Sequence, residues 1–267
     1  MDAIDNHIES INEDNSPILF NRYFIHLAYD GSNFSGWQFQ GNVPTIQQTI
    51  EEAISKILNS PTSIIGCGRT DAGVHATHYY AHFDTTKTLP EQFTFKLNNV
   101  LPNAISIYEV FEVATDAHAR YSATEREYDY FLHTKKDPFK IRFSAEFRFY
   151  PYNFEKLQEV TQLLLQYQDF KSLSKYNPEN KTTICHLTKI AWTQIDDHSY
   201  KFNIAANRFL YNMVRRIVAT TLAVSRDRIS LSDFKKAMDT QSEMPFILTA
   251  PPQGLHLVNV KYPFINN

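Results

Sequence analysis

The order in which strand and helix patterns follow one another is the feature that most constrains the fold of this chain. The first half predicts strands at 22–29, 62–67, 75–83 and 105–112, and helices at 45–59 and 91–99. That order is β-α-β-β-α-β, the arrangement of a ferredoxin-like unit. The helix at 45–59 is the best defined, because its isoleucines share one stripe and Thr45 and Gln48 have the spacing of a capping box.

The second half repeats this order of elements without repeating the residues. It predicts strands at 126–134, 186–195, 199–206 and 255–261, helices at 154–167 and 207–224, and a further helix near Ser232, which this serine can cap. We therefore expect an α+β protein in which two ferredoxin-like halves share a continuous, mainly antiparallel sheet flanked by helices. The active-site cleft is expected between the two halves.

Three parts of the chain are predicted from these patterns. Residues 1–20 are expected to form an acidic, mobile leader, 21–115 the N-terminal half with the glycine-rich loop at 66–76, and 116–267 the C-terminal half. The first 16 residues carry five acids and no Lys or Arg, and the rest of the chain has 24 acidic and 26 basic residues. This near balance excludes a generally basic protein, so any RNA site must be a local basic patch.

Cysteine content and hydropathy favour a cytoplasmic protein. The chain has 2 cysteines, Cys67 and Cys185, which cannot form a disulfide framework. No apolar run approaches the length of a transmembrane helix, and the N-terminus lacks the basic start and apolar core of a signal peptide. We expect no association with a membrane.

The stretch GCGRTDAGVHA at 66–76 carries the most information about function. Three glycines surround Arg69 and Asp71, and glycine permits backbone conformations and close approaches that other residues resist. A carboxylate and a guanidinium in such a loop can meet a ligand closely. An ordinary turn, in which Asp71 caps a helix or pairs with Arg69, is the alternative for an arbitrary D-A-G. The glycine spacing matches neither a dinucleotide-binding loop nor a P-loop.

This loop and the motifs around it resemble the TruA family of tRNA pseudouridine synthases from about residue 22 onward. The other matching motifs are YDGSNFSGWQ (29–38), PTIQQTIEEAI (44–54), LNNVLP (97–102), AHARYSATEREYDYFL (117–132), FLYNMVRRIV (209–218) and APPQGLHLVNV (250–260). The resemblance implies an isomerase that converts uridine to pseudouridine at positions 38–40 of the tRNA anticodon stem-loop. It also implies a homodimer whose shared basic surface holds the anticodon arm across both subunits.

Four residues take their expected roles from this resemblance. Asp71 aligns with the catalytic aspartate, and Arg69 aligns with the arginine that helps to hold the target nucleotide out of the stack. Tyr128 aligns with the tyrosine that lies against the uracil ring. Arg215 aligns with the arginine that pairs with the aspartate.

These residue types suit the reaction. The bond between C1′ and N1 breaks, the uracil turns, and it rejoins the sugar through C5, with no redox change and no group gained or lost, so no cofactor is expected. The reaction needs an ionised carboxylate that attacks covalently or removes a proton, and an opposing arginine keeps a buried aspartate charged. Unstacking the base costs about a few kcal/mol, and stacking on Tyr128 returns roughly 1–3 kcal/mol.

A structural role is the alternative for two of these residues. Tyr128 can be a strand residue packed in the core, which is the usual position of a tyrosine in such a pattern. On the predicted helix at 207–224, Arg208 and Arg215 lie opposite the apolar stripe, where most arginines are solvated or make weak pairs. The family resemblance favours the functional interpretation of both Tyr128 and Arg215.

Three histidines at 75, 78 and 82 suggest a metal site. His75 and His78 face opposite sides of a strand, and no Cys or carboxylate around them has zinc-ligand spacing. We therefore expect no metal. The same segment departs from the family pattern, in which Gly-Gln usually occupies the places of His78 and Tyr79. A second departure lies in the predicted helix at 207–224, where Ala219 replaces a family glycine.

Basic clusters are candidate contacts for RNA phosphates, which position RNA without reading its sequence. They comprise Lys135, Lys136, Lys140, Arg142, Arg226 and Arg228. Solvated loops are the alternative interpretation of these residues. Two other functions are a non-catalytic RNA-binding module, since related folds stack bases on sheet aromatics, and a metal-dependent hydrolase using the histidines. The Arg69–Asp71 loop argues against the binding module, because a mere binder has no use for a carboxylate facing phosphates.

Overall fold

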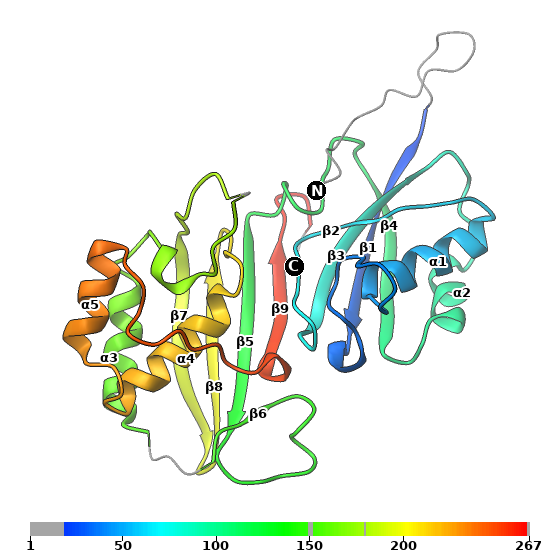
Figure 1. The fold of residues 1–267 in the computed structure, drawn as a ribbon. Helices are drawn as coiled ribbons and strands as arrows, with labels where there is room; N and C mark the ends of the chain where they lie inside the picture. Colours follow the sequence, from blue (N-terminus) through cyan, green and yellow to red (C-terminus); the bar gives the residue numbers. More distant parts are fainter. Residues whose placement is uncertain (1–18, 149–151, 179, 266–267) are drawn as a thin grey trace.

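The computed structural model describes residues 19–148, 152–178 and 180–265, in which one mixed sheet runs through both halves of the chain (Figure 1). The predicted leader at 1–20 lies outside these residues except for its last two. The long strands are β1 (Asn21–Tyr29), β3 (His75–Thr85), β4 (Ile105–Val113), β5 (Glu125–His133), β7 (Leu187–Asp196), β8 (Ser199–Ala206) and β9 (Leu255–Lys261). The short strands are β2 (Ile65–Gly66) and β6 (Ala145–Glu146). The helices are α1 (Ile46–Leu58), α2 (Phe93–Val100), α3 (Phe154–Leu164), α4 (Met213–Ser225) and α5 (Leu231–Thr240).

The strand order of the sheet is β4-β1-β3-β9-β5-β8-β7, with β2 paired to β3 and β6 paired to β5. The two halves meet where β3 runs parallel to β9, through the pairs His75↔His256 and Ala76↔Leu257. The long strands within each half pair antiparallel. The sheet is therefore mixed and mainly antiparallel, as predicted, and a short parallel seam joins its halves.

Each half has its own hydrophobic core, made by the sheet and its own helices. Figure 1 shows α1 and α2 beside the strands of the first half, and α3, α4 and α5 beside those of the second. Tyr128 of β5 packs against both cores. The junction between the halves is therefore a packed region in which side chains from both meet.

Helix α1 forms where its apolar stripe and its cap predict it. Its buried residues are Ile46, Ile50, Ala53, Ile54 and Leu58. The Thr45 hydroxyl accepts a hydrogen bond from the backbone N–H of Gln48 at 3.3 Å, which satisfies one of the free donors at the helix start. The Gln48 side chain donates to Glu52 instead of returning to the cap, so only half of the predicted capping box is formed.

The helix predicted at 207–224 begins six residues late, at Met213. Asn207 holds the preceding segment out of the helix, because its side-chain oxygen accepts from the backbone N–H groups of His186 and Arg208. Asn212, the cap residue, has a left-handed backbone with φ 61°. The expectation that Arg208 shares the polar face of a helix with Arg215 is therefore wrong, because Arg208 precedes the helix.

Three other predicted bounds also differ from the structure. The strand expected at 62–67 is reduced to β2, because the backbone N–H groups of Thr62 and Ile64 donate to the side chains of Ser55 and Glu51. Helix α3 ends at Leu164, after which single-turn bonds, such as Tyr167 N–H to the Leu164 carbonyl, replace helical ones. The cap of α5 is Ser230, whose hydroxyl accepts from the backbone of Asp233; Ser232 lies within the helix. No helix in the described part of the chain is long and apolar enough to cross a membrane.

Candidate active site

The loop between β2 and β3 carries Asp71 and is fixed to the first half by its backbone. Trp37 donates its backbone N–H to the Thr70 carbonyl at 3.1 Å. The Thr70 hydroxyl, which is buried, shares a 2.8 Å hydrogen bond with the phenol of Tyr29. The Tyr79 hydroxyl donates to the Gly68 carbonyl at 2.5 Å. Because these bonds hold the loop from two sides, the position of Asp71 is set by the sheet beneath it.

Two glycines make this arrangement possible. Gly36, with φ +92°, lies so close to the loop that a Cβ there would stand 2.5 Å from the Thr70 carbonyl oxygen. Gly73 has φ +77°, a conformation that strains other residues. Gly68 has open space around it and no left-handed φ, so only part of the glycine pattern is explained by backbone geometry.

Arg215 of α4 forms an ion pair with Asp71, with 2.8 Å between Nη1 and Oδ2. The guanidinium also donates through Nε to the Ala250 carbonyl at 2.7 Å, and through Nη1 to the Asn212 side-chain oxygen at 3.3 Å. The side chains of Arg215 and Asp71 are 15% and 26% exposed. The pair therefore joins the two halves, is partly shielded from water, and leaves part of the carboxylate accessible.

Tyr128 lies next to this ion pair, in the middle of β5. Its ring meets Phe209 edge-on at 5.3 Å between centroids. Burial, with smaller contributions from Cys67 and Asp71, raises the pKa of its phenol, so the ring is neutral. The pairing of β5 with β9 shifts register between Glu127 and Tyr128. A neutral aromatic ring thus stands beside the carboxylate.

The other predicted binding residues are less closely associated with Asp71. Arg69 is exposed, on the same loop. Lys135 and Lys136 are exposed beyond the end of β5 and line a hollow of about 380 Å³, together with three carboxylates of Asp137, Asp196 and Asp197. This hollow has mixed charge, and the two lysines lie seven and eight residues along the chain from Tyr128. The structure does not bring the two lysines together with the ion pair.

The three histidines considered as metal ligands lie in separate surroundings. His75 is buried, accepts the backbone N–H of Gly31 at Nδ1, and stacks on His256 at 4.7 Å. His78 is exposed and lies 2.9 Å from a ring nitrogen of His26. His82 is buried and accepts the Ala119 N–H. Among the described residues, no three potential ligands gather into a metal site.

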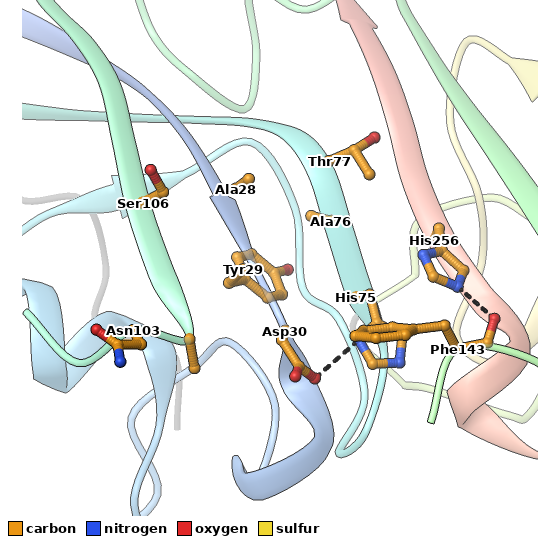
Figure 2. A pocket seen from close by; sticks show the side chains of 11 residues that line it. Ala28, Tyr29, Asp30, His75, Ala76, Thr77, Asn103, Ser106, Phe143 and His256 are labelled. Atoms are coloured by element: carbon orange, nitrogen blue, oxygen red, sulfur yellow. Dashed lines mark hydrogen bonds and ion pairs between the residues drawn. The ribbon is translucent and has the colours of Figure 1, made fainter. Parts of the chain in front are cut away.

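A second hollow, of about 310 Å³, adjoins His75 (Figure 2). Figure 2 shows Asp30 facing His75, with 3.2 Å between Oδ1 and Nδ1, and His256 facing the Phe143 carbonyl. Arg142, from the segment between β5 and β6, forms an ion pair with Asp30. This cluster ties that segment to the first half.

Arg126 is a residue of the site that sequence reasoning missed. Its guanidinium donates to four backbone carbonyls, those of Cys67, Arg120, Ala123 and Asn207. Cys67 begins the Asp71 loop, and Asn207 begins the segment that leads to α4. Arg126 therefore connects to β5 both the loop of Asp71 and the segment that leads to Arg215. Its position two residues before Tyr128, on the same face of the strand, was the available signal.

Cysteine chemistry does not fit this site. Cys67 lies under the loop, and burial raises the pKa of its thiol to about 11. Burial likewise raises the pKa of Cys185 to about 11. Because the thiolate is the nucleophilic form, neither cysteine is suited to attack a substrate at neutral pH.

Comparison with known proteins decides the family. The family described as "tRNA pseudouridine synthase" matches residues 25–122 and 161–263. The "tRNA pseudouridine synthase A" of Bacteroides fragilis is 44% identical over 245 residues, which cover 91% of this chain and 96% of that protein. The chain belongs to the tRNA pseudouridine synthase family. A "tRNA pseudouridine synthase A" of Caldicellulosiruptor bescii is 38% identical over 240 residues, covering 89% and 98% of the two chains.

The segments matched to the tRNA pseudouridine synthase family contain some of the site residues and not others. Arg69 and Asp71 lie in the first matched segment, and Arg215 lies in the second. Tyr128 and Arg126 lie between the two segments. Their placement therefore rests on the contacts described above, rather than on the match to the family.

Proposed function

We propose that this chain isomerises uridine to pseudouridine in the anticodon stem-loop of tRNA, at positions 38–40. The observation that carries the proposal is the ion pair between Asp71 and Arg215, which holds a partly accessible carboxylate beside an aromatic ring. Family membership, with identity above a third along almost the whole chain, supports the same activity. The positions within the tRNA rest on the resemblance of the motifs.

In the proposed reaction, Asp71 is the catalytic residue. Its carboxylate bonds to the nucleotide or removes a proton from the sugar while the C1′–N1 bond breaks. The uracil then turns and bonds to C1′ through C5, which loses its proton, while N1 gains one. Atoms and electrons balance within the nucleotide, so the reaction calls for no cofactor and no metal. Arg215 provides the counter-charge of the carboxylate and holds it in position, because Nη1 of its guanidinium lies 2.8 Å from Oδ2 of Asp71.

Tyr128 and Arg69 are proposed to handle the displaced nucleotide. A uridine must leave its stack before its C1′–N1 bond becomes accessible. The neutral ring of Tyr128 offers a surface for the uracil, and Arg69, which is exposed, is proposed to help hold the nucleotide outside the stack. Lys135 and Lys136 are proposed as phosphate contacts farther from the reaction, at the end of β5.

The architecture supports an active-site cleft between two ferredoxin-like halves, residues 21–115 and 116–267. The strand order within the first half is β4-β1-β3-β2, and β9-β5-β8-β7 in the second half has the same pattern. The ion pair bridges these halves. By the same resemblance, we propose a homodimer that holds the anticodon arm across both subunits and acts on tRNA in the cytoplasm.

One assay tests the proposed activity against its alternatives. The protein is incubated with an unmodified tRNA transcript and excess EDTA, and pseudouridine is mapped along the product. We expect pseudouridine in the anticodon stem-loop, in an amount that EDTA does not change. Tight tRNA binding without any pseudouridine would favour a non-catalytic RNA-binding module. Activity that EDTA removes and zinc restores would favour metal chemistry.

A further inference from the structure

An exposed pair of side chains, Lys175 and Tyr211, is linked to the ion pair through Asn212. Tyr211 directly precedes Asn212, whose side-chain oxygen accepts from the guanidinium of Arg215. Lys175 donates its backbone N–H to the Tyr211 carbonyl at 2.9 Å. Its Nζ lies 5.3 Å from the centre of the Tyr211 ring, within the range of a cation–π contact. Tyr211 is therefore connected to Asp71 through its neighbour Asn212 and the guanidinium of Arg215, by two hydrogen bonds.

The position of this pair is fixed by α4. Arg216 donates from Nη1 to the Ser174 carbonyl at 2.6 Å. This bond holds the segment before Lys175 against the helix. Burial lowers the pKa of Arg216, as expected for a guanidinium that is withdrawn from water to serve a structural bond. The backbone under Lys175 thus follows the helix that carries Arg215, so the pair keeps its place relative to the ion pair.

The side chains of this edge are exposed rather than packed into the core. Tyr211 is 45% exposed, and Tyr176, the next residue after Lys175, is 84% exposed. In the described residues, no carboxylate forms an ion pair with Lys175, whereas Lys140 and Lys189 pair with acids. A free ammonium beside exposed rings matches the chemistry of a nucleotide, in which an anionic phosphate accompanies a base that stacks.

We propose that Lys175, Tyr176 and Tyr211 form a subsite for the nucleotide next to the target uridine. This proposal rests on the proposed function, because it requires the target base to occupy the space beside Asp71. When the target leaves the stack, its neighbour loses a stacking partner. The exposed ring of Tyr211 replaces that partner, and Lys175 binds the adjoining phosphate. Tyr176 extends the aromatic surface away from the site.

The subsite is better suited to phosphate than the lysines first predicted from the sequence. Lys135 and Lys136 share their hollow with a third lysine, Lys140, and with three acids, Asp137, Asp196 and Asp197. The acids offset the positive charge that would attract a phosphate there. Lys175 lies over the ring of Tyr211, and it forms no ion pair with an acid in the part of the chain that the structure describes. Exposed aromatic rings beside a free cation are the features by which single-stranded RNA is bound without reading its sequence.

The test measures the dissociation constant for an unmodified tRNA transcript at several salt concentrations. The variants are Tyr211→Ala, Tyr211→Phe, Lys175→Ala and the double alanine variant. Tyr108→Ala and Lys235→Ala are the matched controls, because Tyr108 is 51% exposed on β4 at the far edge of the sheet and Lys235 is exposed on α5. Thermal unfolding of each variant verifies that it is folded.

We expect Tyr211→Ala to weaken binding by about tenfold, since stacking on one ring contributes this order of affinity. Tyr211→Phe keeps the ring and should stay within about twofold of wild type. Lys175→Ala should make the salt dependence shallower by about one phosphate contact. The double variant should lose less than the product of the single effects, because both residues contact one nucleotide. Both controls should bind like wild type.

Binding by Tyr211→Ala and Lys175→Ala that matches the controls would overturn the subsite. Equal losses in Tyr211→Ala and Tyr211→Phe would also overturn it, because they would exclude stacking. The pseudouridine assay on the wild-type protein, run in parallel, separates this failure from that of the proposed function. Normal pseudouridine formation with control-like variants rejects the subsite alone, whereas weakened binding without any pseudouridine rejects the activity alone.

Discussion

Arg215 Nη1 lies 2.8 Å from Asp71 Oδ2, although the two residues stand 144 positions apart and belong to different halves of the sheet. The loop of Asp71 is bonded to the first half, and Arg215 is bonded to Asn212 and to Ala250 in the second. Any movement between the halves therefore changes this distance. The ion pair therefore depends both on the charge of the carboxylate and on the position of one half relative to the other.

Replacing Arg215 tests whether its charge supports the reaction or only the binding of RNA. Arg215→Ala should lower the single-turnover rate at saturating tRNA by roughly a hundredfold, because a shielded carboxylate loses its counter-charge. Arg215→Lys should rescue only partly, since an ammonium cannot make the same set of directed bonds. A normal saturated rate with weaker, less salt-dependent binding would instead assign Arg215 to a phosphate contact.

Asn212 combines a left-handed backbone with a side-chain bond to Arg215, and two substitutions separate these properties. Asn212→Gly keeps the φ of 61° accessible and removes the side-chain oxygen. Asn212→Ala removes the same oxygen and adds about 1 kcal/mol of backbone strain. We expect both variants to lose a similar part of the single-turnover rate, with Asn212→Ala alone showing the added loss of stability in denaturant unfolding. Wild-type rates in Asn212→Gly would show that the oxygen does not position Arg215.

Arg126 should stabilise the junction more than its partial exposure suggests. Arg126→Ala leaves four carbonyls without their donor, and charged hydrogen bonds of this kind contribute roughly 1.5–3 kcal/mol each when they cannot be replaced by water. We expect a large fall in the free energy of unfolding, measured by urea denaturation. Arg126→Lys should recover only a minor part, because one ammonium cannot reach four carbonyls in a plane. Near-wild-type stability of Arg126→Ala would contradict this role.

His256 should make the fold sensitive to mild acid. Burial, together with the neighbouring His75, lowers the pKa of His256 from 6.5 to about 4. A histidine whose pKa is lowered in the folded state stabilises the fold fully above pH 6.5, and this contribution is lost as pH falls toward 4. The loss amounts to about 3 kcal/mol at pH 4. Asp30, His75 and Arg142 also face this cluster.

The matched variant for this effect is His256→Gln, which keeps a donor for the Phe143 carbonyl and does not titrate. The free energy of unfolding of wild type and variant should be compared from pH 7 to pH 4. We expect a shallower decline in the variant over this window. Parallel declines in the two proteins would show that His256 does not contribute to the acid sensitivity.

Sequence patterns correctly predicted the helices and strands that are defined by interactions between residues close in the sequence. Helix α1 and strands β8 and β9 lie where the periodicity placed them, because a cap and an apolar stripe or alternation define each of them. The strand at 62–67 and the first turns of the helix at 207–224 were wrong for one reason. Side-chain bonds to the backbone hold those segments in other conformations. Ser55 and Glu51 accept from Thr62 and Ile64 in the first segment, and Asn207 accepts from His186 and Arg208 at the second.

Only the site residues that lie in recognisable motifs could be predicted from the sequence. The loop with Asp71 is visible in the sequence, and the family resemblance pairs it with Arg215, which spacing alone cannot do over 144 positions. The bonds of Arg126 and Asn212 could not be predicted, because their partners are backbone atoms and a side chain brought together by the fold. The same holds for Lys175 and Tyr211, which become neighbours only when the chain packs against α4.

Asp71→Asn with an unmodified tRNA transcript examines the proposed role of the carboxylate with the least disturbance of the protein. The asparagine oxygen can still accept from Arg215, so shape and alignment are kept while the charge is removed. We expect unfolding temperature and tRNA affinity close to wild type, and no pseudouridine in a single-turnover assay at saturating enzyme. Pseudouridine formation by Asp71→Asn at a rate within about tenfold of wild type, a difference of only about 1.4 kcal/mol in the barrier, would contradict the assignment of Asp71 as the catalytic residue.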